Sequence, residues 1–259
     1  QAFAHGKHVL CDKPSANALA PALEMNRAAE KSGLVFAMMF HQRRYKKYMR
    51  LKKLLDDGAL GEIKRVQLEN SRYFRTWMYH RSGSWRSSWA GEGGGALLNQ
   101  GQHILDIWQW LFGMPNSIYA VIPYGKYNDF MVDDEATLLM EYPQQRTATF
   151  ILSTGEGSYT ERLEIVGTKG TALLEDLGNL TANELYDPAG VGEAAASAIL
   201  DGLDRLAAQC EHLVVVSNEV FSGGADYAGD TDRYLKALAQ VNNALAARAD
   251  AVVRVVCGI

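Results

Sequence analysis

The chain has 259 residues, of which 47% are hydrophobic and 22% charged, which is ordinary for a globular protein. Its net charge of −4 argues against a nucleic-acid-binding protein, and no run of eighteen apolar residues suggests a membrane-spanning segment. Three widely separated cysteines, Cys11, Cys210 and Cys257, indicate reduced thiols and a cytoplasmic location, and they offer no zinc-ligand spacing.

The first forty residues predict a strand, a helix and a second strand. Residues 7–12 form a short apolar run that leads into Lys13-Pro14, and the proline disfavours helix at the residue before it. Residues 17–32 suit a helix, and residues 34–40 are typical of a buried strand. Strand, helix and strand joined by short loops form a βαβ unit with parallel pairing.

The pattern changes after a second helix, predicted over residues 44–57. The basic run RRYKKYMRLKK in this helix mixes charges with apolar residues at helical spacing, which indicates a solvated face. Apolar and polar residues then alternate in IKRVQLENSRYF, DEATLLMEY, RTATFILST and RLEIVGTKGTALLED. A period of two predicts half-buried antiparallel strands, with hairpins at PQQ and at Gly-Thr-Lys-Gly. The middle of the chain is therefore predicted to be a sizeable antiparallel sheet.

Three consecutive glycines, residues 93–95, precede a predicted helix that starts at Ala96. At 100° per residue, Asn99, His103 and Asp106 fall on one face of this helix. A separate apolar stripe consists of Leu97, Ile104, Trp108, Leu111 and Phe112. Such a helix could form one wall of a polar cleft, with free N–H groups at its glycine-rich start. The glycine at position 101, Gly101, predicts that another backbone or a flat ligand ring comes close to the helix there. The simpler alternative is a half-buried helix with a satisfied histidine and a solvated aspartate.

Two side chains suit proton chemistry. Histidine is the side chain best suited to take a proton near neutral pH, so His103 is a candidate base, with Asn99 to hold a substrate hydroxyl and Asp106 to orient the imidazole. Lys13 follows a predicted parallel strand, and open α/β sheets bind ligands at the carboxyl ends of such strands. An ammonium there can stabilise negative charge that develops on oxygen. The alternative for Lys13 is a surface lysine at a strand end.

Two segments together resemble the Gfo/Idh/MocA oxidoreductases, the relatives of glucose–fructose oxidoreductase and inositol dehydrogenase. GKHVLCDKP is similar to the family's G-K-H-V-x-x-E-K-P segment, with Asp12 in place of the usual Glu. GEGGGALLNQGQHILDIWQWLFGMP is similar to its G-G-G-x-L-x-[DN]-x-G-x-H-x-x-D segment. LDDGALGEI and RLEIVGTKG match in place and order, so the resemblance covers residues 1 to about 190.

The resemblance implies an NAD- or NADP-dependent dehydrogenase that transfers hydride at a secondary alcohol of a sugar, cyclitol or related polyol. Lys13 matches the family's active-site lysine and, with Pro14, is an expected cofactor contact. His103 matches the family's general acid/base. Asn99 stands where many members carry Asp, which leaves the proton relay to His103 and Lys13. No metal is implied.

Arg43 and Arg86 lie in segments that often line the family's substrate pocket, and Asp106 is a further candidate there. Family members begin with a strand and a G-x-G-x-x-G phosphate turn about ninety residues upstream of the lysine motif, and this sequence has no such turn. Because the turn places the pyrophosphate on a helix N-terminus, the chain is expected to be an N-terminally truncated enzyme that binds its cofactor poorly or not at all.

The composition shifts after residue 190. LVVV and AVVRVVCGI predict strands on either side of a helix whose apolar stripe is Tyr234, Leu238, Val241 and Leu245. Residues 199–259 resemble the C-terminal part of adenosylcobinamide kinase/adenosylcobinamide-phosphate guanylyltransferase in the S-N-E-V, Y-x-x-x-L-x-x-x-N and A-D-x-V-x-x-V-x-G-I positions. Asn218 and Glu219 are either the remnant of a nucleotide site or polar residues that end a strand. The resemblance does not reach that enzyme's P-loop or guanylylated histidine, so it implies no kinase activity.

The predicted fold class is α/β plus α+β. Residues 1–40 would be the last βαβ unit of a Rossmann domain, and residues 199–259 a βαβ-like tail. Residues 41–190 would form a large, mostly antiparallel open sheet with helices on one face, serving as substrate and oligomerisation domain. A polyol dehydrogenase that forms a homo-oligomer through the open sheet is the leading functional hypothesis. The alternatives are a catalytically silent interaction module that works through its sheet, and a fusion remnant whose tail acts in cobinamide nucleotide metabolism.

Overall fold

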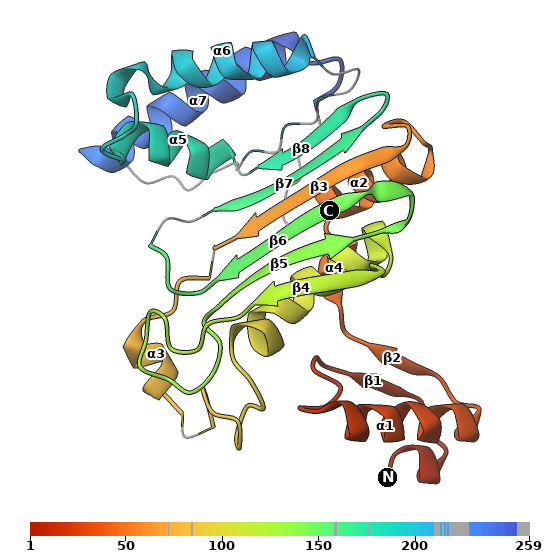
Figure 1. Cartoon of the computed structure of the whole chain (residues 1–259). Coiled ribbons are helices and arrows are strands. Elements are labelled where there is room, and N and C mark those ends of the chain that lie inside the picture. Colours follow the sequence, from red (N-terminus) through yellow and green to blue (C-terminus); the bar gives the residue numbers. More distant parts are fainter. Residues whose placement is uncertain are drawn as a thin grey trace.

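The computed structural model describes residues 1–252 except 72, 84, 158, 159, 176, 210–212, 214, 216 and 218–227. Figure 1 shows a small α/β unit at the N-terminus, a large twisted sheet in the middle and a group of three helices after it. Within these described ranges, no helix is both long and apolar enough to cross a membrane.

The N-terminal unit is the predicted βαβ arrangement. Strands β1 (Val9–Cys11) and β2 (Phe36–Met38) pair in parallel, and helix α1 (Leu19–Ser32) joins them after the short helix η1 (Phe3–His5). The expectation that the second strand is buried is wrong, because a two-stranded sheet with one helix leaves most of its surface uncovered. Leu10 and Val35 are 63% and 61% exposed, and Ala29 is the one buried residue among the described residues of this unit.

The central sheet has six strands in the order β4-β5-β6-β3-β7-β8. Their bounds are β3 (Ile63–Asn70), β4 (Ser117–Val121), β5 (Glu135–Glu141), β6 (Thr147–Ser153), β7 (Glu161–Gly167) and β8 (Thr171–Glu175). All neighbours pair antiparallel except β3 and β6, which are parallel. Both predicted hairpins form, β5–β6 through η4 (Pro143–Gln145) and β7–β8, so the mostly antiparallel sheet is confirmed. Strand β4 was not predicted.

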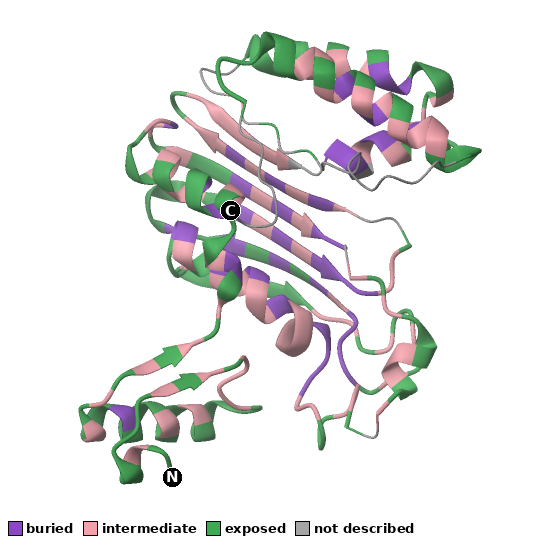
Figure 2. Ribbon diagram, turned by 180° about the vertical axis from the view of Figure 1, so that it is seen from behind, coloured by how far each residue is buried: buried purple, intermediate pink, exposed green. Residues whose placement is uncertain are grey.

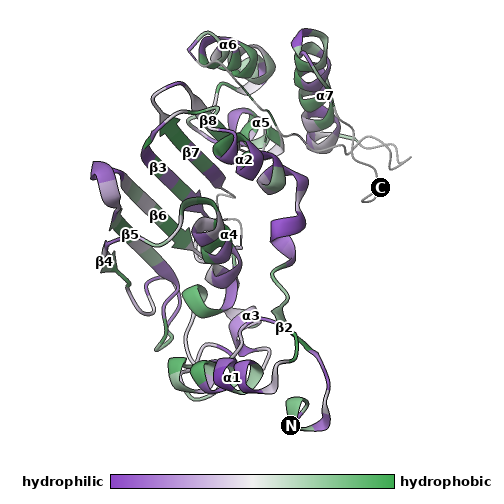
Figure 3. Cartoon of the chain, turned by 90° about the vertical axis from the view of Figure 1, so that its right-hand side faces the viewer, coloured by the Kyte–Doolittle hydropathy of each residue, from purple (hydrophilic) through white to green (hydrophobic). Residues whose placement is uncertain are grey.

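One face of the sheet carries the main core. Helices α2 (Lys46–Asp56) and α4 (Gln102–Phe112) lie on the same side of the sheet (Figure 3). Buried side chains alternate along the strands (Figure 2), and they include Val66, Leu68, Leu138, Met140, Phe150, Leu152, Leu163 and Ile165. Each fully buried side chain of this kind contributes ~1.5–3 kcal/mol. The core therefore fixes α4 firmly against the strands.

The glycine-led helix is less regular than predicted. A π-helical turn, η3 (Leu97–Gly101), precedes α4, so spacing of 100° per residue does not hold across Asn99. A Cβ atom at Gly101 would lie 2.9 Å from the Leu152 side chain, so the close approach predicted there is made by a core leucine rather than by a backbone or a ligand. The predicted apolar stripe is confirmed, with four of its members, Ile104, Trp108, Leu111 and Phe112, buried in the main core.

The C-terminal part of the described chain is helical. Helices α5 (Leu177–Tyr186), α6 (Ala195–Ala207, after η5, Gly192–Ala194) and α7 (Asp230–Arg248) share a small core of their own. The predicted stripe on α7 is confirmed, since Leu238 and Val241 are fully buried there. Most of the strands predicted at 213–216 and 251–259 lies outside the described residues, as do Asn218 and Glu219.

Candidate active site

Polar side chains that follow the carboxyl ends of the two parallel strands, β1 and β2, lie close together. Lys13 follows β1 in a loop that contains the cis Lys13–Pro14 peptide, and η2 (His41–Arg44) follows β2. The Nζ atom of Lys13 donates a hydrogen bond of 2.7 Å to the main-chain carbonyl oxygen of Asn99, within the π turn. Residues 86 positions apart in the sequence therefore meet at the start of the glycine-led helix.

His103 lies on the first turn of α4, beside this contact. Its ring packs edge-on against the ring of His41, with centroids 4.9 Å apart. Its Nδ1 atom is buried and has no hydrogen-bond partner among the described residues. Burial lowers the pKa of His103 below 6.5, and the nearby positive charge of Lys13 and the second imidazole of His41 lower it further. A neutral imidazole at pH 7 is free to accept a proton.

Lys13 has an altered proton affinity as well. Partial burial lowers the pKa of its ammonium, and the carboxylates of Asp12 and Glu92 oppose this shift. Asp12 Oδ1 also accepts a hydrogen bond from the main-chain N–H of Lys13 (2.8 Å). The side chain is thus a half-buried cation that gives up a proton more readily than an exposed lysine does.

Arg43 and Asp106 bind each other. The guanidinium of Arg43 donates two hydrogen bonds to the Asp106 carboxylate, from Nε (2.7 Å) and from Nη2 (2.5 Å). The Asp106 side chain is 7% exposed, so this fork is mostly shielded from water. The hydrogen bonds that Arg43 donates to Asp106 raise the pKa of Arg43. The pair connects η2 to α4 and so holds His41 against His103. The Asp106 carboxylate was expected to orient the imidazole of His103, but it orients the guanidinium of Arg43 instead.

The glycine run packs tightly but leaves few free N–H groups. The Asp133 carboxylate accepts hydrogen bonds from Gly95 N (2.8 Å) and Leu97 N (2.7 Å), so these two N–H groups, predicted to be free, are occupied by a side chain of the protein. A Cβ atom at Gly95 would lie 1.9 Å from the Asp133 carbonyl oxygen. At Gly93, with φ of +84°, a Cβ atom would lie 2.7 Å from Asn17, in the loop that carries Lys13. The glycines therefore let two loops close on the helix start.

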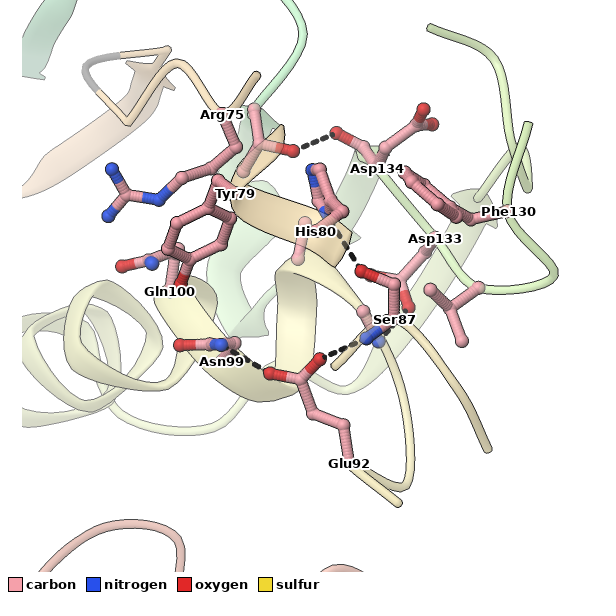
Figure 4. A pocket seen from close by; sticks show the side chains of 14 residues that line it. Arg75, Tyr79, His80, Ser87, Glu92, Asn99, Gln100, Phe130, Asp133 and Asp134 are labelled. Carbon is pink, nitrogen blue, oxygen red and sulfur yellow. Dashed lines mark hydrogen bonds between the residues drawn. The ribbon is translucent and has the colours of Figure 1, made fainter. Parts of the chain in front are cut away.

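A pocket opens on the other side of Asn99 (Figure 4), and sequence reasoning missed most of it. The Asn99 side-chain amide donates to the Glu92 carboxylate, which also accepts from Ser87 N (2.8 Å). His80 Nδ1 lies 2.5 Å from Ser87 Oγ. Asn99 thus faces Glu92. Constant helical spacing had predicted that Asn99 shares one face with His103 and Asp106, and this prediction is wrong.

Arg86, a predicted substrate contact, lies at the edge of this region. Its Nη1 atom donates to the Tyr79 hydroxyl (2.7 Å), and its guanidinium stacks on the rings of Tyr79 and Trp85, at 4.5 and 4.3 Å from their centroids. The segment from 73 to 89, which contains the short helix α3 (Trp77–Arg81), alternates arginines with aromatic residues. That composition was the available signal for the missed pocket residues. In the described chain, no group of three His, Cys, Asp or Glu side chains could hold a metal ion.

The chain is similar in sequence to known dehydrogenases. Residues 48–173 match the GFO/IDH/MocA C-terminal domain. Trans-1,2-dihydrobenzene-1,2-diol dehydrogenase of Bos taurus is 31% identical over 173 residues, which cover 66% of this chain and 48% of the relative. The NADP⁺-dependent scyllo-inositol 2-dehydrogenase of Bacillus subtilis is 33% identical over 129 residues, covering 49% of this chain and 34% of the relative.

A solved structure gives the same result. The WlbA dehydrogenase of Chromobacterium violaceum, crystallised with NADH and UDP-GlcNAcA, superposes with a TM-score of 0.62 at 25% identity, over 66% of this chain and 50% of that one. The present chain thus spans between a third and a half of the curated relatives named above and half of this structural neighbour. The two relatives and the neighbour are all dehydrogenases by name; one relative is NADP⁺-dependent, and the neighbour was crystallised with NADH.

The C-terminal resemblance is also found, over a longer stretch than predicted. Residues 132–259 match the cobinamide kinase / cobinamide phosphate guanyltransferase family, rather than 199–259 alone. The overlap, residues 132–173, forms strands β5 to β7 and the start of β8, which are integral to the central sheet. The chain therefore carries the sequence features of the Gfo/Idh/MocA oxidoreductases in its first two-thirds and those of the cobinamide kinase family towards its C-terminus.

Proposed function

We propose that this chain supplies the proton-transfer and substrate-binding part of an NAD(P)-dependent oxidoreductase that acts on a secondary alcohol of a sugar, cyclitol or related polyol. One observation carries the proposal: the Lys13 ammonium is anchored on the Asn99 carbonyl, four residues before His103 in the same helix. The lowered pKa of His103 supports its role as the base. The names of the matched dehydrogenases support the reaction class.

The residues divide the chemistry between them. Lys13 and Pro14 would lie at the nicotinamide end of an NAD(P) cofactor, which would supply the acceptor for the hydride of the carbinol carbon. Neutral His103 takes the hydroxyl proton, and Lys13 stabilises the alkoxide-like oxygen. Each preorganised donor of this kind is worth ~3 kcal/mol of barrier. Asn99, held by Glu92, contacts the substrate from the side of the neighbouring pocket. Lys13 and Pro14 fit the nicotinamide end of the cofactor, and no residue of a phosphate-binding turn accompanies them in this sequence.

The test measures polyol-dependent reduction of NAD⁺ and NADP⁺ at 340 nm with inositols, aldoses and dihydrodiols. It uses the chain itself and a version extended at its N-terminus by a G-x-G-x-x-G half-domain. We expect activity in the extended version and weak NADH binding by the chain alone. His103→Ala should lower turnover by roughly two to four orders of magnitude. His5→Ala, an exposed histidine, is the matched control. An unchanged rate in His103→Ala assigns the proton transfer elsewhere.

We further propose that two copies pair through the uncovered face of the sheet. Leu139 and its cross-strand neighbour Tyr119 are 47% and 71% exposed, and both lie on the face opposite the core. Tyr119→Lys should shift the molar mass measured by light scattering to that of a monomer. A wild-type chain that is monomeric at micromolar concentration contradicts this pairing.

A further inference from the structure

We propose that the pocket beside Asn99 binds an anionic group, a carboxylate or a phosphate, on the substrate, and that Arg75 recognises it. The inference rests on the proposed function and narrows its substrate class to acidic sugars. The pocket encloses about 360 Å³ including its open mouth, and its wall includes Asn99 and Gln100 of the π turn. A substrate hydroxyl at Asn99 therefore leaves the rest of the same molecule within reach of this pocket.

The carboxylates of the pocket already have hydrogen-bond donors. Asp133 accepts from two main-chain N–H groups at the start of the glycine-led helix. Asp134 accepts from three, those of Lys126 (3.0 Å), Tyr127 (2.8 Å) and Asn128 (3.1 Å). Glu92 accepts from Ser87 N and from the Asn99 amide. These three acids are thus used by the protein itself, and their negative charge is partly offset by the N–H dipoles.

Arg75 lines the pocket, and Arg86 lies at its edge, hydrogen-bonded to the Tyr79 hydroxyl. Among the described residues, no carboxylate lies within ion-pair distance of Arg75 or Arg86. Arg75 Nε is buried without a hydrogen-bond partner. The guanidinium of Arg75 lies 4.6 Å from the centroid of the Tyr79 ring, and that of Arg86 lies 4.5 Å from the same centroid. Two guanidinium groups on one ring place positive charge at this edge of the pocket, and positive charge attracts an anion.

Arg75 is held in place before any ligand arrives. Its main-chain N–H donates to the carbonyl oxygen of Thr154 (2.8 Å), at the end of β6, and its guanidinium packs against the ring of Tyr79. Figure 4 shows Arg75, Tyr79 and Gln100 on one side of the pocket, and Phe130 and Asp134 on the other. An anion bound at Arg75 therefore lies on the side away from Asp134.

His80 adds a further unused group. Its Nε2 atom is buried without a partner, while Nδ1 lies against Ser87 Oγ. Burial lowers the pKa of His80, so the ring is neutral near pH 7 and carries one N–H. When the serine hydroxyl donates to Nδ1, that N–H is on Nε2, which has no acceptor among the described residues. The pocket thus offers unused donors from Arg75 and His80, and its three carboxylates already accept hydrogen bonds from the protein. Oxygens that only accept, in a planar or tetrahedral set, match this inventory.

The test compares three sugars of one ring type without cofactor: glucuronate, glucose 6-phosphate and glucose. Binding is followed by the fluorescence of Trp85, whose ring lies 4.3 Å from the Arg86 guanidinium, and is checked by calorimetry. We expect at least one acidic sugar to bind roughly ten- to a hundredfold more tightly than glucose, the range of one charge-assisted pair. Whether glucuronate or the phosphate binds better tells which anion the pocket takes.

Variants assign the effect to Arg75. Arg75→Met should lower the affinity for the acidic sugar to that for glucose, and Arg75→Lys should keep part of the preference. Arg81→Met is the matched control, because this exposed arginine stacks on Trp77 at 3.8 Å outside the pocket. Equal affinity for acidic and neutral sugars, or no binding of either acid, overturns the proposal. So does an acid preference that survives in Arg75→Met.

These outcomes are separate from failure of the proposed function. If the chain oxidises neutral polyols through His103 but shows no preference for acidic sugars, only the proposal of an anion pocket is refuted. A chain whose acid preference depends on Arg75, but whose turnover is unaffected by His103→Ala, loses only the assigned chemistry.

Discussion

The Arg43–Asp106 ion pair should be the interaction in the candidate site on which stability depends most. Asp106→Ala leaves a guanidinium beside α4 with two unsatisfied donors. Removing one partner of a buried pair costs about 3–5 kcal/mol. Arg43 is 38% exposed and Asp106 is 7% exposed, so water can solvate part of the stranded cation. We therefore expect the free energy of unfolding to fall by about 2–3 kcal/mol.

Urea unfolding followed by circular dichroism measures this change. Asp106→Asn keeps one acceptor and should lose about half as much. Asp57→Ala is the matched control, because its pair with Lys53 is exposed at both ends (53% and 63%) and is worth about 0–1 kcal/mol. A double-mutant cycle with Arg43→Met isolates the coupling. A loss in Asp106→Ala no larger than in the control, or a coupling near zero, refutes the reasoning.

Three further predictions concern charge and space. The folded-state pKa of His103 is below its unfolded value near 6.5, so the unfolded chain binds more protons. The stability that this group contributes is therefore present above pH ~6.5 and is lost as the pH falls. NMR titration should show a higher pKa for His103 in Lys13→Met, and an unchanged value contradicts the contact between the two charges. Glu92→Gln removes a charge that raises the pKa of Lys13, so the midpoint for amine labelling of Lys13 should move to lower pH; a midpoint that stays put or rises rejects this. Gly95→Ala should destabilise the fold by ~3 kcal/mol or more, since its Cβ would overlap a facing carbonyl oxygen, whereas Gly202→Ala, with open space inside α6, should stabilise by up to ~1 kcal/mol; equal melting temperatures for the two variants argue against the clash.

The sequence predicted elements whose cause is local. The period of two in β5, β6 and β7 reports one buried face, and the short turns fix their hairpins. Strand β4, SIYAV, has no buried residue in the structure, so no alternation could reveal it. It forms because its main chain pairs with the edge of β5. Pairing with a neighbour, rather than the strand's own side chains, defines that element.

The site was predictable in part. Lys13 and His103 were identified from chemistry and from a resemblance, but their partners come from distant segments. His41 follows the second parallel strand and could have been suspected by the same argument as Lys13. Glu92 and Arg75 carry no local signature, because their roles depend on contacts with Asn99 and Tyr79. Helical spacing failed at Asn99 for the same reason, since long-range contacts decide how that turn is wound.

Because of the π turn, the position of the Asn99 carbonyl oxygen depends on how many residues the turn contains more than on which side chains they carry. Removing Gln100 would let Leu97–Gly101 rewind as a regular α-helix, with better hydrogen-bond geometry. Every residue ahead of the deletion would then rotate by about 100° about the helix axis, so the oxygen that holds the Lys13 ammonium would point elsewhere. A one-residue deletion at this position should thus break the Lys13 contact together with the hydrogen bonds of Gly95 and Leu97 to Asp133.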